Sequence, residues 1–372
     1  MDASVVRLGH AGLMLVSTTD FFYPLVEDPY LQGRIACCNV LSDLFAMGVP
    51  DCDTMLMLLS VSTQMQPAER DVVTAMMMRG FNDCAEEAAT SVTGGQTVKN
   101  PWPIIGGTAT AVVKEAALVR PGGIRPGHVI VLTKPLGTQL AVNAQQWLGE
   151  EKNWAKIKAA VSRDQVAGMY RAACRSMAHL SRTAARLMAE HGATAATDVT
   201  GFGPVGHLTN LAEHAAASDG GVPVRIVLDR LPVLEGALAI DDAVGGMFKL
   251  REGLSAETSG GLFVALPEER VEGFVAAMAR EDELGWEVTV VGRAEALPGS
   301  AADAAAAAAA AEGAAGGASV AAGCADCAAA ADAAASGAAT TAAAEPAATP
   351  LVVFSDSFAF VEVPHLPPLR PS

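Results

Sequence analysis

The stretch 197–208, Thr-Asp-Val-Thr-Gly-Phe-Gly-Pro-Val-Gly-His-Leu, constrains the fold of this chain more than any other. Its three glycines fall within six residues, a density that costs entropy in a helix or strand and is typical of a loop whose backbone approaches a ligand. Apolar residues on one helical face follow, at Leu208, Leu211, Ala212 and Ala215. The pattern predicts a glycine-rich loop that leads into a helix N-terminus, where backbone N–H groups bind anions.

Asp198 lies in the same predicted loop. Because a carboxylate repels a phosphate, Asp198 would contact one only through a divalent cation, and we interpret the stretch as a metal–nucleotide site. A glycine-rich loop without a ligand is the alternative, since such loops before helices are common.

Apolar runs and helical patterns alternate along the chain, which predicts an α/β fold with an α+β part. We expect strands at 12–18, 54–61, 91–93, 104–114, 128–133, 223–229, 261–266, 286–292 and 352–363. Helices are expected at 29–47, 66–90, 163–191 and 206–217, the first capped by Asp28 with Pro29 in its first turn. The turn-rich segment 120–123 divides the chain into two predicted domains, 1–120 and 121–372.

An alanine-rich stretch at 299–349 interrupts the second domain. It has five acids but no Lys or Arg across 301–349 and buries too little apolar surface to offset its ordering entropy, so we expect a disordered insertion. Cys324 and Cys327 within it have the spacing of a metal or redox pair. A chance pair in low-complexity sequence is the favoured interpretation, because no second pair or neighbouring histidine accompanies them.

The charge balance limits the partners. The 372 residues carry 25 Lys and Arg against 41 Asp and Glu, a formal charge of −16, which argues against a nucleic-acid or anionic-membrane partner. The seven scattered cysteines form no disulfide framework, and Cys37 and Cys38 are expected to be buried and structural. No segment has the pattern of a signal peptide or a membrane span, so we expect a cytoplasmic protein.

Aspartates in separate elements suit a hard cation. Asp20 follows a predicted strand, where open α/β sheets bind ligands. An aspartate at this position is equally typical of a turn or a helix cap. Asn39 and Asp43 share one helix face, which we expect to line a polar cavity, with a solvated helix edge as the alternative. Two or three converging aspartates are typical of Mg·ATP sites, and the lack of a His/Cys cluster argues against zinc.

The chain resembles the selenophosphate synthetases (selenide, water dikinases) of the eukaryotic type, which belong to the ATP-binding superfamily of aminoimidazole ribonucleotide synthetase. The resemblance covers nearly the whole chain except the insertion. The motifs that carry it are the 197–208 stretch, Thr-Thr-Asp at 18–20, Asp-Pro-Tyr at 28–30, Gly-Arg-Ile-Ala at 33–36, Asn-Val-Leu-Ser-Asp-Leu at 39–44, Ala-Met-Gly at 46–48, Thr-Ser-Val-Thr-Gly-Gly-Gln-Thr at 90–97, Asn-Pro-Trp at 100–102, Leu-Thr-Lys-Pro-Leu-Gly-Thr-Gln at 132–139 and Glu-Thr-Ser-Gly-Gly-Leu at 257–262.

The resemblance implies a two-domain fold, a homodimer or a heterodimer with a paralogue, and synthesis of selenophosphate, AMP and phosphate from ATP, selenide and water with Mg²⁺. It places Mg²⁺ on Asp2, Asp43 and Asp198. It places ATP against Met1, Asp2, Asp20, Asp43, Gly94, Gly95, Gln96 and Thr97, the glycine pair alone being equally typical of a tight turn. For the segment 257–261 we favour a structural turn over catalysis.

Members of this family carry a catalytic Cys or Sec and a neighbouring Lys ahead of the residue that matches Asp2. Since the sequence begins at Met1, we assign no catalytic residue and expect an N-terminally truncated form of an active enzyme. The alternatives are a catalytically silent ATP-binding subunit that regulates an active paralogue, and another synthetase of the superfamily. Another synthetase of the superfamily would fit the fold but not the amino-acid sequence at residues 94–97 and 100–102.

Overall fold

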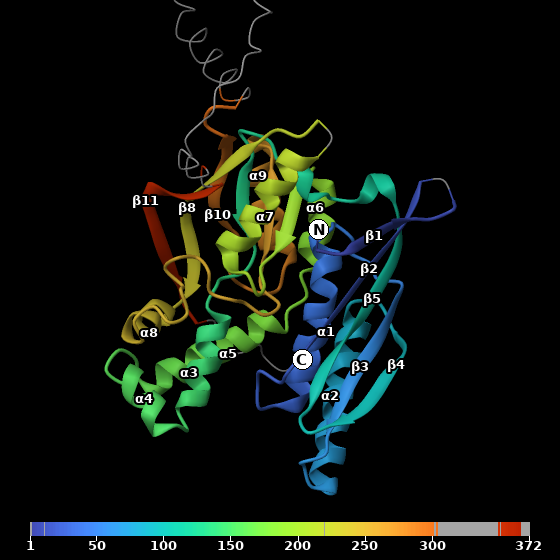
Figure 1. Cartoon of the computed structure of the whole chain (residues 1–372), viewed down its shortest axis with the longest axis vertical. Coiled ribbons are helices and arrows are strands. Elements are labelled where there is room, and N and C mark those ends of the chain that lie inside the picture. The colour runs from blue at the N-terminus through green and yellow to red at the C-terminus, as the bar shows by residue number, and fades with distance from the viewer. Residues whose placement is uncertain are drawn as a thin grey trace, which may run out of the picture.

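The computed structural model describes residues 2–365 apart from 11, 219, 301–302, 304–348 and 350. The strands among these residues form two β-sheets. Figure 1 shows the sheets side by side, with helix α1 (Pro29–Ala46) between them. Met1, the Cys324–Cys327 pair and nearly all of the predicted insertion lie outside the described residues. Within those residues, no helix is both long and apolar enough to cross a bilayer.

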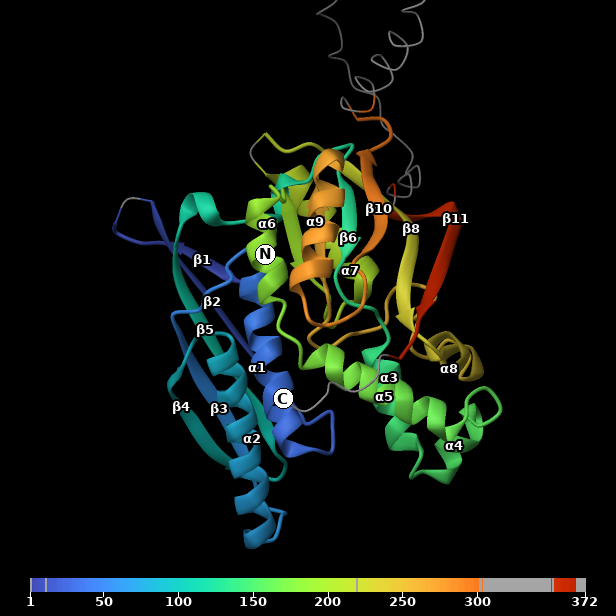
Figure 2. The same ribbon diagram turned by 180° about the vertical axis from the view of Figure 1, so that it is seen from behind.

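The first sheet has the strand order β1-β2-β5-β3-β4. Its strands are β1 (Ser4–Arg7), β2 (Leu13–Phe22), β3 (Thr54–Ser62), β4 (Val92–Asn100) and β5 (Ile104–Lys114). Helices α1 and α2 (Pro67–Glu87) cover one face, as the two opposite views show (Figures 1 and 2). The other face carries exposed apolar side chains, among them Val6, Leu56, Val98 and Val112.

Helix α1 begins where its cap predicts. The Asp28 carboxylate accepts hydrogen bonds from the backbone N–H groups of Tyr30 and Leu31, and Pro29 occupies the first turn. The helix is buried on nearly all sides because it packs on β2 and β5 of one sheet and on β7 (Ala195–Asp198) of the other. A polar side chain on this helix therefore faces either a partner or a cavity.

The second sheet has the order β11-β8-β10-β6-β9-β7. Besides β7 its strands are β6 (Val129–Leu132), β8 (Val224–Leu234), β9 (Leu262–Leu266), β10 (Thr289–Ala296) and β11 (Val352–Val363). Its helices are α3 (Thr138–Trp147), α4 (Glu151–Ile157), α5 (Arg163–Met177), α6 (Arg182–Glu190), α7 (Gly203–Ala217), α8 (Ala237–Ala243) and α9 (Glu268–Glu281). Short 3₁₀ turns at Glu115–Ala117 and Pro121–Gly123 join the two sheets. The predicted closing strand at 352–363 is confirmed, and it pairs parallel to β8.

Several predicted bounds are wrong. The strand predicted at 12–18 continues to Phe22, so Asp20 lies within β2 rather than after it. The strand predicted at 91–93 continues to Asn100, so residues 94–97 form part of β4 instead of a turn. The helix predicted at 163–191 is two helices, α5 and α6, and α7 starts three residues before the predicted position. Strands β1 and β7 and helices α3, α4, α8 and α9 were not predicted.

Candidate metal and nucleotide site

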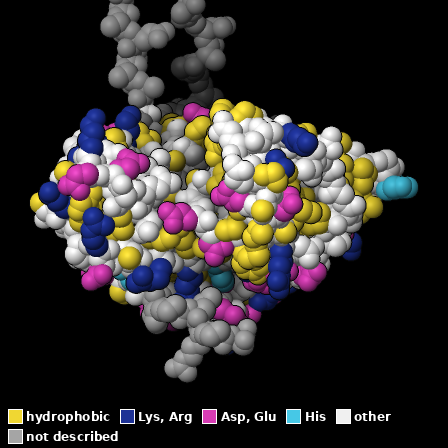
Figure 3. Space-filling view, turned by 90° about the horizontal axis from the view of Figure 1, so that it is seen from below, with side chains coloured by type: hydrophobic (Ala, Val, Ile, Leu, Met, Phe, Trp, Pro, Cys, Tyr) yellow, Lys and Arg dark blue, Asp and Glu magenta, His cyan; other side chains and the backbone are white. Residues whose placement is uncertain are grey.

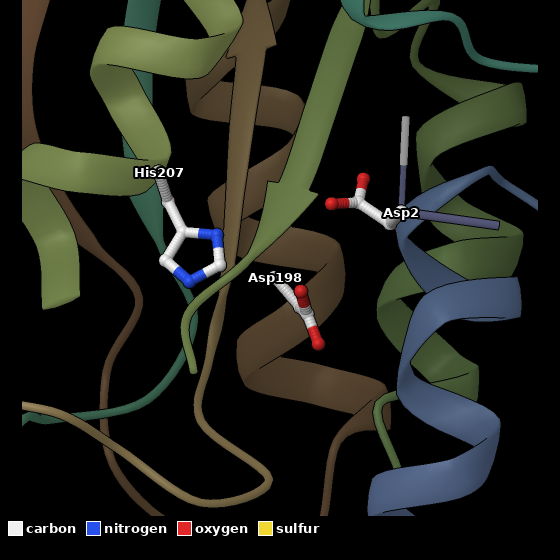
Figure 4. Close-up of side chains that lie close together, drawn as sticks. All are labelled: Asp2, Asp198 and His207. Atoms are coloured by element: carbon white, nitrogen blue, oxygen red, sulfur yellow. The ribbon is translucent and has the colours of Figure 1, made fainter. Parts of the chain in front are cut away.

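Three of the predicted aspartates meet between the two sheets. Asp2 precedes β1, Asp43 lies near the end of α1, and Asp198 ends β7; all three line one cavity of about 230 Å³. Asp198 is 2% exposed. In Figure 4, Asp2 and His207 approach from opposite sides of Asp198, and one ligand atom of each of the three lies within 4.8 Å of the others.

Hydroxyl groups hold the three carboxylates. Thr197 Oγ1 donates to Asp2 Oδ1 at 2.9 Å, and Ser42 Oγ donates to Asp198 Oδ2 at 2.6 Å. Thr18 Oγ1 donates to Asp43 Oδ2 at 2.5 Å. The Ser42–Asp198 and Thr197–Asp2 bonds join segments that are 156 and 195 residues apart in the chain. The cavity is therefore built jointly by the two halves of the chain.

The electrostatics of the cavity favour a cation. Burial and the charge of Asp198 raise the pKa of Asp2 to about 6, and the same two causes raise the pKa of Asp43 to about 8. Burial also raises the pKa of Asp198. Among the described residues, no Lys or Arg forms an ion pair with any of the three. Carboxylate oxygens that crowd one another in this way are suitable ligands for a divalent cation such as Mg²⁺.

His207, on α7, was not singled out from the sequence. Its Nε2 accepts a hydrogen bond from the Thr200 backbone N–H at 2.9 Å, and burial lowers the pKa of the ring. A neutral ring that accepts at Nε2 carries its proton on Nδ1, so neither ring nitrogen is left free, and the bonding assigns His207 as an acceptor that shapes the loop rather than as a metal ligand. The only sequence signal for His207 was its position nine residues after Asp198. Its contact with the loop could not be predicted, because it depends on the folded conformation of that loop.

The glycine-rich loop differs in part from its prediction. Asp198 ends β7 and is not in the loop, which spans residues 199–202. Gly203 has φ +69° and a side chain there would collide with the backbone of Leu254, while a side chain at Gly206 would press on Phe202. Packing thus accounts for two of the three glycines, and Gly201 alone faces open space.

The structure places Asp20 next to the cavity, where its charge contributes to the raised pKa of Asp43. Asn39 Nδ2 donates to Asp20 Oδ2, so on the polar face of α1 Asn39 is bonded to a partner, while Asp43 lines the cavity. Gly95 lies in the same cross-strand row as Asp20, through Gly107 and Met57. Three strand spacings, about 14 Å, separate them. Within one chain, residues 94–97 are therefore not brought to the cavity.

Two other predicted features are placed as well. Glu257 is buried and accepts from the backbone N–H groups of Gly137 and Thr138 at 2.7 and 2.9 Å, which agrees with the structural interpretation of its segment. Cys37 and Cys38 are buried in the core, as expected.

A larger cavity of about 880 Å³ lies between α1, α5 and α6 and holds none of the predicted site residues. Its arginines include Arg34 and Arg182, which pair with Glu87 and Asp51. Seen from below, basic and acidic side chains are interspersed over this face of the molecule (Figure 3). We assign the site to the smaller cavity, because the unpaired carboxylates converge there.

Comparison with known proteins gives matches along most of the chain. Residues 1–113 match the N-terminal domain of AIR synthase related proteins and residues 125–304 match the C-terminal domain. The chain is 55% identical to selenide, water dikinase 3 of Danio rerio over 278 residues, which are 75% of this chain and 61% of that protein. It is 48% identical to selenide, water dikinase of Trypanosoma brucei brucei over 310 residues, 81% of this chain and 77% of that protein. The chain spans about three fifths of the length of the vertebrate relatives.

Solved structures share the fold. The hydrogenase maturation protein HypE in complex with ATP superposes with a TM-score of 0.59 at 19% identity, covering 80% of this chain and 81% of that one. The AaThiL structure complexed with AMPPCP and TMP has a TM-score of 0.59 at 17% identity and covers 80% and 85% of the two chains. Together with the two matched domains, these structures confirm the predicted two-domain fold class.

Proposed function

The chain belongs to the selenide, water dikinase family of AIR synthase related proteins, and we propose that it makes selenophosphate, AMP and phosphate from ATP, selenide and water at the acidic cavity. The observation that supports this most is the convergence of Asp2, Asp43 and Asp198 from both halves of the chain, with pKa values raised by burial. Such a set binds a divalent cation, and phosphoryl transfer from ATP requires one.

In this proposal the three carboxylates hold Mg²⁺, with Asp20 beside them against the nucleotide. Bound Mg²⁺ would neutralise the charge that develops on the phosphate oxygens. The hydroxyls of Thr18, Ser42 and Thr197 each take one carboxylate oxygen by a hydrogen bond and so aim the remaining oxygens into the cavity. The chain thus contributes positioning and charge, the main requirements of phosphoryl transfer.

The uncovered face of the first sheet supports the proposal of a homodimer. Leu56, Val98 and Val112 are 41%, 49% and 44% exposed there, and exposed apolar patches of this kind are typical of protein–protein interfaces. Leu56→Asp should convert a dimer into a monomer in light scattering coupled to size-exclusion chromatography. Unchanged mass would reject this face as the interface.

We place the protein in the cytoplasm, as the cysteine pattern favours a reducing compartment.

The activity is tested by anaerobic incubation of the chain, and of any longer natural form of it, with ATP and Mg²⁺, with and without selenide. The proposal predicts AMP, phosphate and selenophosphate in equal amounts, and only when selenide is present. ADP as the product, or AMP formed equally without selenide, would refute it. Asp198→Asn is the matched variant and should lose this turnover.

A further inference from the structure

The side chain of Asp20 is held by a path of hydrogen bonds that starts in the other half of the molecule. Asp20 Oδ2 accepts from Asn39 Nδ2 of α1, and Asn39 Oδ1 accepts from the Ser259 backbone N–H at 2.9 Å. The Ser259 carbonyl oxygen accepts from Lys134 Nζ at 3.0 Å. Asn39, Ser259 and Lys134 are all buried. The path therefore links the end of β6 to β2 across the boundary between the two sheets.

Lys134 uses all of its donors in this arrangement. Its ammonium donates to the carbonyl oxygens of Ser259 and Ser176, each at 3.0 Å, and of His179, at 2.8 Å. Burying a charge costs free energy unless it is fully hydrogen-bonded, and burial lowers the pKa of Lys134 to about 8. The three carbonyls come from the last turn of α5, from the residues just after that helix and from the segment before β9. Lys134 thus fixes these two segments relative to each other.

Asn39 has only one orientation that fits. Its Nδ2 faces the carboxylate of Asp20, which accepts, and its Oδ1 faces the N–H of Ser259, which donates. The other oxygen of Asp20 accepts from the Phe21 backbone N–H at 2.8 Å. The plane of the Asp20 carboxylate is therefore set from both sides, by its own strand and by the opposite half of the chain.

We propose that Asn39 and Lys134 are positioning residues that hold Asp20 in the orientation needed for nucleotide binding. The nucleotide site is then complete only when the two halves of the chain are docked, because Lys134 and Ser259 belong to one half and Asp20 and Asn39 to the other. This inference rests on the proposed function, since it takes Asp20 to contact the nucleotide.

A double-mutant cycle tests the path through the dissociation constant of Mg·ATP, measured by calorimetry. Asn39→Ala should weaken binding about tenfold in the otherwise native chain, because Asp20 loses a charge-assisted hydrogen bond. In the Asp20→Ala background, Asn39→Ala should cause no further loss. A loss of the same size in both backgrounds would show a general structural effect and overturn the inference, as would unchanged affinity in Asp20→Ala.

Two further variants keep the test sharp. Asn39→Asp retains an acceptor for the Ser259 N–H but no donor to Asp20, so it should lose as much affinity as Asn39→Ala; wild-type affinity in both would overturn the inference. Lys134→Met should weaken binding in the same direction and also lower the unfolding midpoint. Asn143→Ala is the matched control, since Asn143 Nδ2 donates to a carbonyl within α3, away from the cavity. Selenide-dependent AMP release is measured separately, so the path can fail while the proposed activity stands.

Discussion

Replacing Asp43 by asparagine removes one ionisable group from the acidic cavity and keeps the shape of the side chain. Without a cation, burial and the charge of Asp198 raise the pKa of Asp43 from 3.8 to about 8 in the folded chain. The folded state then binds more protons than the unfolded state between these values. The free energy of unfolding of the wild type should therefore fall as the pH rises from 3.8 towards 8.

The magnitude follows from the size of the pKa shift. Each pH unit inside this window costs up to about 1.4 kcal/mol for a single group. From pH 5 to pH 7 the limit is about 3 kcal/mol, and sharing of the repulsion with Asp2 and Asp198 lowers it to about 2 kcal/mol. Asparagine has no ionisable proton, so the stability of Asp43→Asn relative to wild type should rise by about 2 kcal/mol over this range.

Urea unfolding in EDTA at pH 5, 6 and 7 measures this difference. Asp71→Asn, at an exposed aspartate of α2, is the matched control and should follow the wild type. Mg²⁺ at pH 7 should stabilise the wild type, because the proposed site binds it through the native carboxylates, and should give Asp43→Asn little gain. A stability difference between Asp43→Asn and wild type that does not change with pH would refute the reasoning.

Two further substitutions test how the surrounding fold is held. Gly95 has φ +142°, and a side chain there would overlap the Met57 carbonyl oxygen, so Gly95→Ala should lower the free energy of unfolding by about 2–5 kcal/mol in urea titrations. The control is Gly94→Ala, because its new methyl group meets nothing closer than Leu56 Cδ2 at 3.4 Å. It should change the free energy of unfolding by less than about 0.5 kcal/mol. Equal losses in the two glycine variants would contradict this account of β4. Glu257→Ala leaves two buried N–H groups at the start of α3 without an acceptor, so it should lower the free energy of unfolding by about 2–5 kcal/mol in the same measurement. Glu252→Ala, at an exposed glutamate, is the control and should leave the free energy of unfolding unchanged. An unchanged free energy in Glu257→Ala would show that α3 does not depend on this carboxylate.

Local signals in the sequence predicted the elements whose ends depend on nearby residues. The start of α1 is one, because Asp28 caps its own helix. The extension of β2 through Asp20 and of β4 through residues 94–97 was missed, because both are set by pairing with strands β5 and β3, which are distant in the sequence. Glycines and polar residues at such positions resemble turns until the neighbouring strand is known.

The sequence predicted the aspartates of the site but not the hydrogen bonds that hold them in place. Asp2, Asp43 and Asp198 were named from the sequence, and the structure brings them to one cavity. Their partners Ser42 and Thr197 and the loop contact of His207 depend on segments that meet only in the folded chain. Lys134 carried no local signal, since a lysine that satisfies three backbone carbonyls looks like any other in the sequence.

The central claim is that the carboxylates at the junction of the two sheets form a cation-dependent nucleotide site. Calorimetric titration of ATP into the wild type and into Asp198→Asn, each with Mg²⁺ and with EDTA, tests it most directly. Binding is expected for the wild type with Mg²⁺, and affinity at least ~10-fold weaker in the other three titrations, because buried Asp198 is a principal ligand of the cation in the proposed site. Equal affinity for ATP in Asp198→Asn, or in the wild type with EDTA, would contradict it.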